Sequence, residues 1–450
     1  MLVSRGPRGV ALAACTALLF TVSACGNDTA QPETPIAVRL YGSDGNMQNG
    51  FGKELKDQAG LLNGMKGTIP LTQLPQSFKS RMVALNNKLT DYLYAGETYD
   101  AVVISALAAQ LAGSTAPADI AAQIDGVTNG GERCESAATC LELAREGVDI
   151  EYRGPSLTRG GFTDAGEPST ASYATLHFNL NGQIDDGKTE FVGAGDESAA
   201  SKKAPPPAKK QQGGKNDKKD GSPLKIGGLL PQTGDLAFAY PPMKTAADLA
   251  IKDINAAGGA LGDPVQWVDG DDGTNPAVAK ATVAKHVGAG VSVIIGAAAS
   301  GISRAVLPDV VAAGLIMFSP SNTDAGLSTV EDKGLYFRTA PSDILQGRAL
   351  ADVILRDGPK KIAIVARKDS YGEGLQGNVR SELERVGVGG DRVKLLTYDP
   401  PADSKAPPVN FTAGAEEIRN YGADAVLVIG FAESTEVIKA LAAAKVEFVS

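Results

Sequence analysis

The sequence predicts an α/β protein whose parallel sheets are covered by helices on both faces. After residue 223, short apolar runs alternate with helical stretches, which is typical of buried parallel strands joined by crossover helices. A polar linker divides the chain of 450 residues, a length that suits about two to three domain-sized units. The net charge of -9 argues against a nucleic-acid partner and favours solubility.

The first 25 residues have the pattern of an export signal. Two arginines precede an apolar run over 10–20, and small residues then lead into Cys25. Small residues followed by Cys resemble a bacterial lipobox, which implies cleavage before Cys25 and lipidation of its thiol and new amino group. A secretory signal with a chance cysteine is the alternative, whereas a membrane-spanning anchor needs about 20 apolar residues. We therefore expect a tether over 26–35 and a lipid-anchored protein on the extracytoplasmic face of the cell membrane.

The body of the chain retains two cysteines, Cys134 and Cys140. An export signal implies an oxidising compartment, in which two cysteines so close in sequence are expected to form a disulfide. Two free thiols are the alternative.

The N-terminal block spans 36–198 and contains one strong strand, Ile36–Tyr41. It is mostly helical from Phe78 to about Gly147, and it ends in a hairpin near 173–192. Lys, Pro, Gly and Ser dominate the segment 199–223, and no apolar face can be drawn on it. This composition predicts a disordered, solvated linker.

The second block reads as two regions, 224–341 and 342–450. A helix over about 243–257 has one apolar face and ends at Gly258-Gly259. The apolar runs that predict buried strands are Lys225–Leu230, Ser292–Gly296, Leu315–Ser319, Lys361–Ala366, Val393–Tyr398 and Ala425–Gly430.

Two glycine-rich motifs match nucleotide-binding sequence patterns but lack the expected structural context. Gly182–Thr189 fits a P-loop, but strand-like residues follow where phosphate binding needs a helix, so a hairpin turn is the better interpretation. Gly372–Gly377 fits a dinucleotide fingerprint, but five residues separate it from the preceding strand, so a loop over another ligand is favoured. We therefore predict no cofactor.

No set of residues with catalytic or metal-ligand spacing is evident. His177 and His286 are far apart in sequence, and Gly273 falls one place early for a calcium loop after Asp269, Asp271 and Asp272. These acids are interpreted as part of a polar loop between a strand and a helix. The chain is predicted not to be an enzyme.

Polar and aromatic residues follow the predicted strands, where ligands of open α/β sheets bind. Hydroxyls at a helix N-terminus suit a carboxylate, and a lone acid among aromatics suits an ammonium group. Taken singly, each hydroxyl also fits an N-cap or turn residue. As a set they predict a pocket for a zwitterion, formed by Asp44, Ser300, Ser321, Thr323, Tyr371 and Phe431.

Several segments together resemble the periplasmic binding proteins for branched-chain amino acids. They are LKIGGLLPQTGDLAFAYPPMKTAADLAIKDINAAGG at 224–259, VIIGAAAS, IMFSPSNTD, IAIVARKDSYGEG and AVLVIGFAES, with LYGSDGN and ETYDAVV in the N-terminal block. The resemblance implies a type I periplasmic-binding-protein fold, with two doubly wound parallel-sheet lobes joined by a hinge. It further implies a monomeric receptor that delivers a small amino acid to the permease subunits of an ABC importer.

Carried over residue by residue, the resemblance places Ser300, Ser321 and Thr323 on the α-carboxylate and Asp44 on the α-ammonium. Tyr371 and Phe431 match aromatic positions of the opposite lobe. Asp44 stands where the best-known members have glutamate, and Phe431 where they have tyrosine, which leaves the side-chain preference of the ligand open. A ligand sensor or a receptor for an amide or urea-type solute on the same fold is the alternative function.

The order of the blocks departs from the family. The family runs from the block that begins at Leu224 into the block that begins at Ile36, whereas this chain runs the other way, as a circular permutation would. We therefore expect one lobe to combine 224–341 with about 71–163. The other should combine 342–450 with 36–70 and the hairpin, so that Ile36–Tyr41 and Ala425–Gly430 share a sheet.

Overall fold

The computed structural model describes residues 35–209, 223–402 and 406–449. The predicted signal, Cys25 and the tether up to residue 34 lie outside the described residues, and so does the linker over 210–222. The predictions made for these segments therefore remain predictions.

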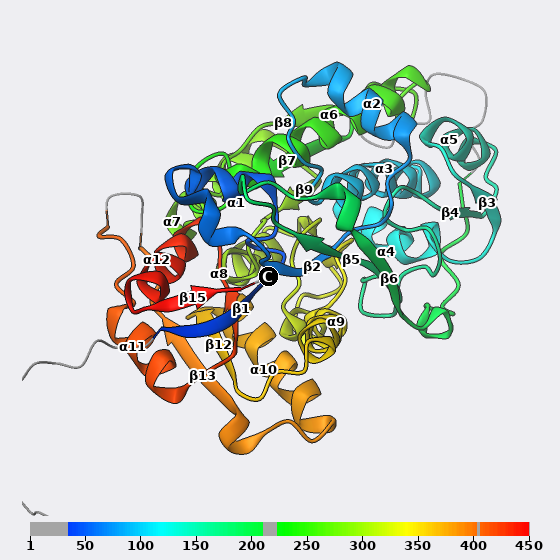
Figure 1. Cartoon of the computed structure of the whole chain (residues 1–450). Coiled ribbons are helices and arrows are strands. Elements are labelled where there is room, and N and C mark those ends of the chain that lie inside the picture. Colours follow the sequence, from blue (N-terminus) through cyan, green and yellow to red (C-terminus); the bar gives the residue numbers. More distant parts are fainter. Residues whose placement is uncertain (1–34, 210–222, 403–405, 450) are drawn as a thin grey trace, which may run out of the picture. The chain divides into compact units, whose positions relative to one another are not determined.

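The largest sheet of the described chain contains strands from both sequence blocks (Figure 1). The strand β1 (Ile36–Gly42) pairs in parallel with β14 (Ala425–Ile429), and Arg39 faces Ala425 in the register. The prediction that these two segments share a sheet is confirmed. The sheet runs β13 (Val393–Tyr398), β12 (Ile362–Arg367), β14, β1, β2 (Lys66–Pro70), β5 (Thr170–His177) and β6 (Glu190–Gly195), and β15 (Val446–Phe448) pairs with the start of β1.

A second sheet is parallel throughout. Its order is β11 (Tyr336–Arg338), β10 (Ile316–Ser319), β9 (Val293–Gly296), β7 (Lys225–Leu229) and β8 (Gln266–Val268). Two short strands, β3 (Glu132–Cys134) and β4 (Ile150–Tyr152), form a separate pair. The predicted α/β class is confirmed, and the apolar runs that predicted strands match strands within one or two residues.

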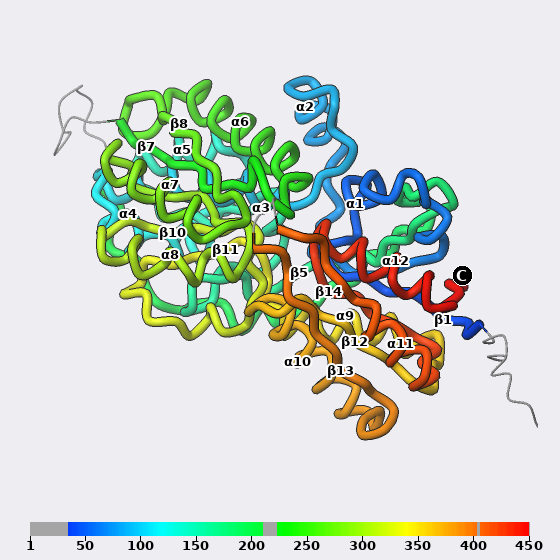
Figure 2. The backbone as a smooth tube through the Cα atoms, turned by 90° about the vertical axis from the view of Figure 1, so that its left-hand side faces the viewer, coloured from blue at the N-terminus to red at the C-terminus, as the bar shows by residue number. Residues whose placement is uncertain are grey.

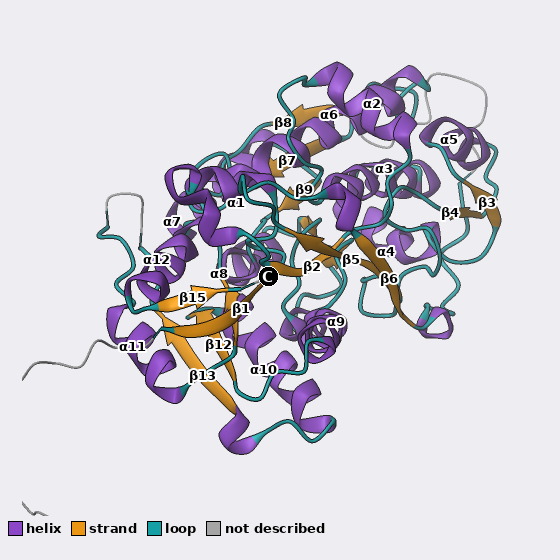
Figure 3. Ribbon diagram, viewed as in Figure 1, coloured by secondary structure: helices purple, strands orange, loops and turns teal. Residues whose placement is uncertain are grey.

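Helices pack on both large sheets, as Figures 2 and 3 show. Near the five-stranded sheet lie α2 (Gln76–Leu85), α3 (Ala95–Ala112), α4 (Pro117–Val127), α5 (Ala137–Arg145), α6 (Tyr240–Ala256), α7 (Pro276–Ala289) and α8 (Ser300–Ala312). Near the eight-stranded sheet lie α1 (Asn49–Glu54), α9 (Asp343–Arg356), α10 (Ser370–Arg385), α11 (Thr412–Tyr421) and α12 (Thr435–Ala443). Short 3₁₀ helices lie at Lys56–Leu62, Asp186–Lys188, Glu197–Ala199, Ala237–Ala239, Ala325–Thr329, Gly390–Arg392 and Ala432–Ser434.

The helix α3 is buried along its whole length. A helix that is apolar on all sides is stable in water only when other elements surround it, and α6, α4 and the strands β9 and β10 pack against α3. Within the part of the chain that the structure describes, no helix alone has the length and apolarity to cross a membrane. The helices α3 and α4, which meet at 111°, meet those criteria only as a pair.

The predicted disulfide is present. It joins Cys134 at the end of β3 to Cys140 on α5, with the two Cα atoms 5.4 Å apart. Both cysteines are buried beside the apolar core around α3.

Replacing Cys134 and Cys140 together by serine is expected to destabilise the protein. Loss of a cross-link over a sequence separation of 6 enlarges the entropy of the unfolded chain, which corresponds to about 2 kcal/mol. Urea unfolding of the wild type and the double variant measures this difference. Two thiols that react with an alkylating reagent in the unreduced, unfolded wild type would contradict the prediction.

The structure differs from the sequence prediction at two segments and agrees with it at a third. The segment 199–209 was expected to be disordered, but it packs against the fold: Lys209 N donates to the Leu111 carbonyl at 2.9 Å, and Gln123 donates to the Pro206 carbonyl at 3.0 Å. Pro205 and Ala208 are half-buried, and Ala208 packs against the apolar core around α3, which the composition of the segment does not predict. The segment Gly182–Thr189 connects β5 to β6 as the expected hairpin. The segment Gly372–Gly377, expected as a loop, lies inside α10 instead, because Asp369 caps that helix by accepting from Gly372 N at 2.9 Å.

Candidate functional site

The turn after β1 carries Asp44 to the point where the two sheets face each other. Asn46 fixes this turn, because its side chain accepts from Ser43 N at 2.9 Å and donates to the Val428 carbonyl of β14 at 2.9 Å. A side chain at position 45 would place its Cβ only 2.3 Å from the Gly430 carbonyl oxygen, so Gly45 permits the close approach of the two strand ends. The pairing of β1 with β14 therefore positions Asp44.

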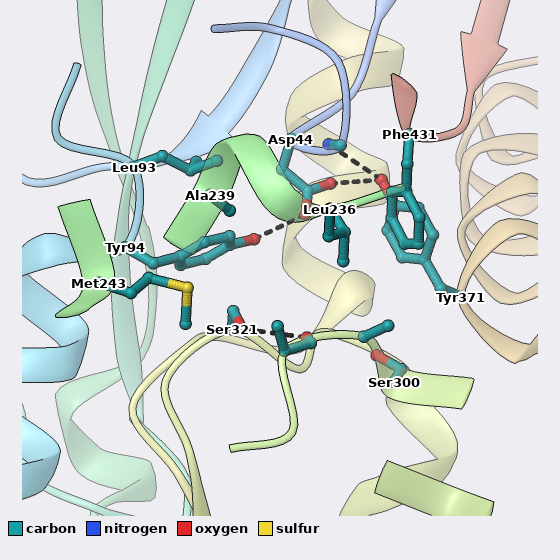
Figure 4. A pocket seen from close by; sticks show the side chains of 13 residues that line it. Asp44, Leu93, Tyr94, Leu236, Ala239, Met243, Ser300, Ser321, Tyr371 and Phe431 are labelled. Carbon is teal, nitrogen blue, oxygen red and sulfur yellow. Dashed lines mark hydrogen bonds between the residues drawn. The ribbon is translucent and has the colours of Figure 1, made fainter. Parts of the chain in front are cut away.

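Three side chains donate hydrogen bonds to the buried Asp44 carboxylate, and Figure 4 draws those from Tyr94 and Tyr371. Tyr94, directly before α3, donates at 2.6 Å, and Tyr371, in the first turn of α10, donates at 2.7 Å. Gln346 of α9 donates through Nε2 at 2.8 Å. Burial raises the pKa of Asp44, and the hydrogen bonds from Tyr94, Tyr371 and Gln346 oppose that rise. The hydrogen-bond partners of the Asp44 carboxyl group are thus neutral donors, with no cation among them.

The N-terminal end of α8 lies on the other side of the same cavity. Ser300 begins this helix, and its Oγ accepts from the N–H groups of Thr323 and Asp324 at 3.3 Å each. Ser321 donates to the Ala298 carbonyl at 3.0 Å. Helix N-termini carry partial positive charge and favour anions. The cavity therefore has an acid on one wall and an anion-favouring helix end on the other.

Aromatic rings form a further wall. Tyr371 and Phe431 are stacked, with ring centroids 5.3 Å apart and planes inclined by 18°. The guanidinium of Arg367 lies 3.8 Å from the centroid of the Phe431 ring, and Arg367 in turn binds Glu433 at 2.7 Å. This arrangement holds Phe431 in one orientation at the edge of the cavity.

The cavity has a volume of about 20 Å³. Five of the six predicted ligand residues line it, namely Asp44, Ser300, Ser321, Tyr371 and Phe431. Thr323 does not line it; it is buried below Ser300 and supports that serine through its backbone N–H. The remaining lining residues are Gly45, Leu93, Tyr94, Leu236, Ala239, Met243, Ala298 and Ala299.

Sequence reasoning missed Tyr94, Gln346 and the apolar lining residues. Tyr94 adopts a left-handed backbone conformation with φ of 53° immediately before α3, which turns its ring toward Asp44. A left-handed tyrosine has no signature in sequence. In the sequence, Gln346 is an ordinary polar residue of a helix, and only the packing of α9 on β2 brings it to Asp44. Among the described residues, no cluster of His, Cys, Asp or Glu has the arrangement of a metal site.

Two helix-covered sheets with a polar and aromatic cavity between them define the class of two-lobed binding proteins. The family described as periplasmic binding protein matches residues 223–449, and this chain belongs to that family. The Leu/Ile/Val-binding protein homolog 3 of Brucella melitensis biotype 1 is 28% identical over 211 residues, which cover 46% of this chain and 54% of that protein. The Leu/Ile/Val-binding protein of Citrobacter freundii is 35% identical over 162 residues, or 36% of this chain and 42% of that protein.

The chain thus spans about half the length of the curated relatives it matches. Among solved structures, the branched-chain amino acid transporter substrate-binding protein LivJ of Streptococcus pneumoniae, in complex with isoleucine, is 26% identical. That match covers 49% of this chain and 61% of that one, with a TM-score of 0.41.

Proposed function

We propose that this chain is an extracytoplasmic solute-binding receptor that captures a small amino acid and delivers it to an ABC importer. The observation that carries the proposal is the placement of Asp44 opposite the N-terminal end of α8 across one cavity. A free amino acid has the complementary polarity, with an ammonium group at one end and a carboxylate at the other. The names of the relatives, which are Leu/Ile/Val-binding proteins, point to branched-chain amino acids.

In this proposal the α-carboxylate of the ligand accepts hydrogen bonds from Ser300 and the backbone at the start of α8, and from Ser321 once its hydroxyl turns away from the Ala298 carbonyl. The α-ammonium donates to Asp44, whose partners Tyr94 and Tyr371 keep their hydroxyls beside it. The aliphatic side chain packs against the apolar part of the lining, which is supplied by Leu93, Leu236 and Met243. Charge fixes the orientation of the ligand, and apolar contact selects its side chain.

Ligand entry requires the two walls to separate. A cavity of about 20 Å³ accommodates about one water molecule, whereas binding sites for small molecules commonly measure roughly 300–1,000 Å³. The chain passes between the sheets in segments such as 71–75 and 339–342, and small changes of backbone angle there would open the cavity as a hinge.

We also infer that Cys25 carries the lipid anchor and that the two halves of the chain stand in permuted order. The family match that begins at 223 and ends at 449, together with the pairing of β1 with β14, supports the permuted order. The boundaries of the two lobes remain predictions. Intact mass of the mature protein tests the lipid, because a mass without acyl groups would exclude it.

Binding of leucine, isoleucine and valine to the purified protein tests the proposal. Saturating ligand should stabilise the folded state, by about 2.7 kcal/mol at a concentration one hundred times Kd. Two analogues of leucine are matched controls: 4-methylpentanoate lacks the ammonium group, and 3-methylbutylamine lacks the carboxylate. Both should shift the melting temperature far less than leucine. A protein that responds to neither leucine, isoleucine nor valine, or that responds equally to leucine and the analogues, would contradict the proposal.

A further inference from the structure

A second buried carboxyl group, Asp343, stands at the start of α9. The Asp343 side chain is fully buried, and within the described chain neither of its carboxyl oxygens has a hydrogen bond of normal geometry, although the Thr323 hydroxyl is near enough to favour the charged form. Its backbone N–H donates to the Thr323 carbonyl at 2.7 Å, which ties α9 to the loop below Ser300. A buried, unpartnered carboxylate would be costly, so the state of this group requires an explanation.

Gln346 contacts the Asp44 carboxylate and lies about one helical turn after Asp343. It lies three residues after Asp343, on the same face of α9, and it is also fully buried. Its Nε2 group donates to Asp44 at 2.8 Å and to the Thr68 carbonyl at 3.4 Å, whereas its Oε1 atom has no partner in the described chain. An amide that turns its N–H groups toward one carboxylate points its carbonyl oxygen the other way. The carbonyl on its other side needs a donor, and a carboxyl group supplies one only when it is protonated.

The surroundings of Asp343 favour the neutral acid. Burial raises the pKa of Asp343 well above its usual range, and the charge of Asp44 raises it further, while the Thr323 hydroxyl and Arg338 act in the opposite direction. Asp324 adds a further negative charge. The one guanidinium among these groups, Arg338, is already bound to Glu167.

Tyr173 of β5 faces the same group. Burial and then Asp343 raise the pKa of Tyr173 well above its usual range, so this residue is also neutral. Its hydroxyl has no partner in the described chain, and the same holds for Thr68 Oγ1 and Thr323 Oγ1. Thr68 and Tyr173 project from one face of the β2–β5 pair, which α9 covers. The groups that face Asp343 are therefore acids or neutral hydroxyls, apart from the paired Arg338.

We propose that Asp343 is held as a neutral carboxylic acid and is a positioning residue for Asp44. Its O–H group donates to Gln346 Oε1, which keeps Gln346 Nε2 directed at Asp44 Oδ1. One proton thus resides on the acid that never meets the ligand, and Asp44 stays ionised to receive an ammonium group. This inference rests on the proposed function, because it assigns Asp44 that role.

Two variants distinguish the effect of the titratable proton of Asp343 from the effect of its packing. Asp343→Asn retains a donor that cannot titrate, and Asp343→Leu retains similar bulk without a donor. The folded wild type keeps a proton that the unfolded chain releases above about pH 3.9, so the stability of the wild type falls as pH rises from there toward the folded pKa. The Asn variant lacks this loss. Urea unfolding between pH 4 and pH 8 should therefore show that the stability of Asp343→Asn rises relative to that of the wild type as pH increases. The ratio of the two unfolding constants should change by up to about tenfold per pH unit.

Calorimetry with leucine as the probe gives the second readout. Asp343→Asn should bind leucine within about threefold of the wild type, whereas Asp343→Leu should bind at least about tenfold more weakly, as expected for loss of one buried donor. A stability difference between Asp343→Asn and the wild type that does not change with pH would overturn the inference. Leucine affinity unchanged in Asp343→Leu would overturn the positioning role.

The stability measurement needs no ligand, so it distinguishes the two proposals. A wild type that binds no leucine, combined with the pH-dependent gain of Asp343→Asn, would refute the proposed function and support the neutral acid. Leucine binding by the wild type, combined with no pH-dependent gain of Asp343→Asn, would support the proposed function and refute the neutral acid. If Asp343→Leu does not fold, the comparison of Asp343→Asn with the wild type still decides whether Asp343 is neutral.

Discussion

Asp44→Asn is expected to reduce leucine affinity by roughly 30-fold to several thousand-fold, which corresponds to about 2–5 kcal/mol. The asparagine has nearly the shape of the aspartate: its carbonyl oxygen still accepts from one of the hydroxyls of Tyr94 and Tyr371, and its NH2 group can donate to the oxygen of the other. It has no negative charge, however, and the ammonium group of the ligand would then be buried without a counterion. Because Asp44 is only 5% exposed, solvent offers little compensation.

Isothermal calorimetry measures this loss, and Asp399→Asn is the matched control. Asp399 undergoes the same change of charge, but its side chain is 86% exposed in a surface pair with Lys368, so leucine affinity should not change. Thermal unfolding of both variants checks that the fold is intact. Equal affinity of the wild type and Asp44→Asn would remove Asp44 from the site.

The same carboxylate predicts how affinity depends on pH. Burial raises the pKa of Asp44 above its ordinary value, and a bound ammonium would lower it again because the charged form is then paired. Binding therefore releases a proton when pH is below the raised pKa of the free protein. Leucine affinity should fall as pH drops through that value, and Asp44→Asn should lack this dependence.

Arg338→Met is expected to lower the free energy of unfolding by about 3–5 kcal/mol, the typical cost of breaking a buried ion pair. The Arg338 side chain is fully buried, and its Nε group donates to Glu167 Oε2 at 2.9 Å. Its Nη1 group donates to the carbonyl oxygens of Asn322 and Asp324 at 3.2 and 2.9 Å. Removing the guanidinium leaves the largely buried Glu167 carboxylate without a cation and, within the described chain, with only the Ser328 hydroxyl as its donor; it also takes one donor from each of the two carbonyl oxygens.

Arg356→Met is the control for Arg338→Met. Arg356 pairs with Glu190 at 3.0 Å, and this pair also joins the N-terminal block to the C-terminal one, but both side chains are more than half exposed. Exposed pairs contribute about 0–1 kcal/mol, so Arg356→Met should unfold close to the wild type in urea. Adding Glu167→Met to Arg338→Met should restore part of the stability, because the stranded carboxylate is then removed. A loss below about 1 kcal/mol for Arg338→Met would show that this ion pair does not hold the blocks together.

Strands that are buried on both faces could be predicted from sequence, whereas β2 and the strands of only three residues could not. The run Ala425–Gly430 predicted β14 because a strand covered by helices must be apolar at every position. The strand β2 contains Gly67 and ends at Pro70, and β8 and β11 have three residues each, so their periodicity carries no signal. The segment 199–209 shows the opposite error: its composition is typical of disorder, yet the segment packs against the fold.

The sequence by itself determined the chemistry available to this protein. It determined the α/β class through apolar periodicity, and it predicted the disulfide through two neighbouring cysteines in a chain that begins with the pattern of an export signal. The polar and aromatic residues placed directly after the strands determined which side-chain types could recognise a zwitterion. These properties are local, because a few neighbouring residues decide them.

The tertiary structure decided which of those residues meet. Only the pairing of β1 with β14 brings Asp44 from the start of the chain to Tyr371 near its end, and only the packing of α9 on β2 places Gln346 against Asp44. It also left Thr323 outside the cavity and brought Tyr94 into it. The physical reason is that hydrogen bonds and burial act over a few ångströms in space, and distances in space between distant segments are set by how the sheets and helices pack.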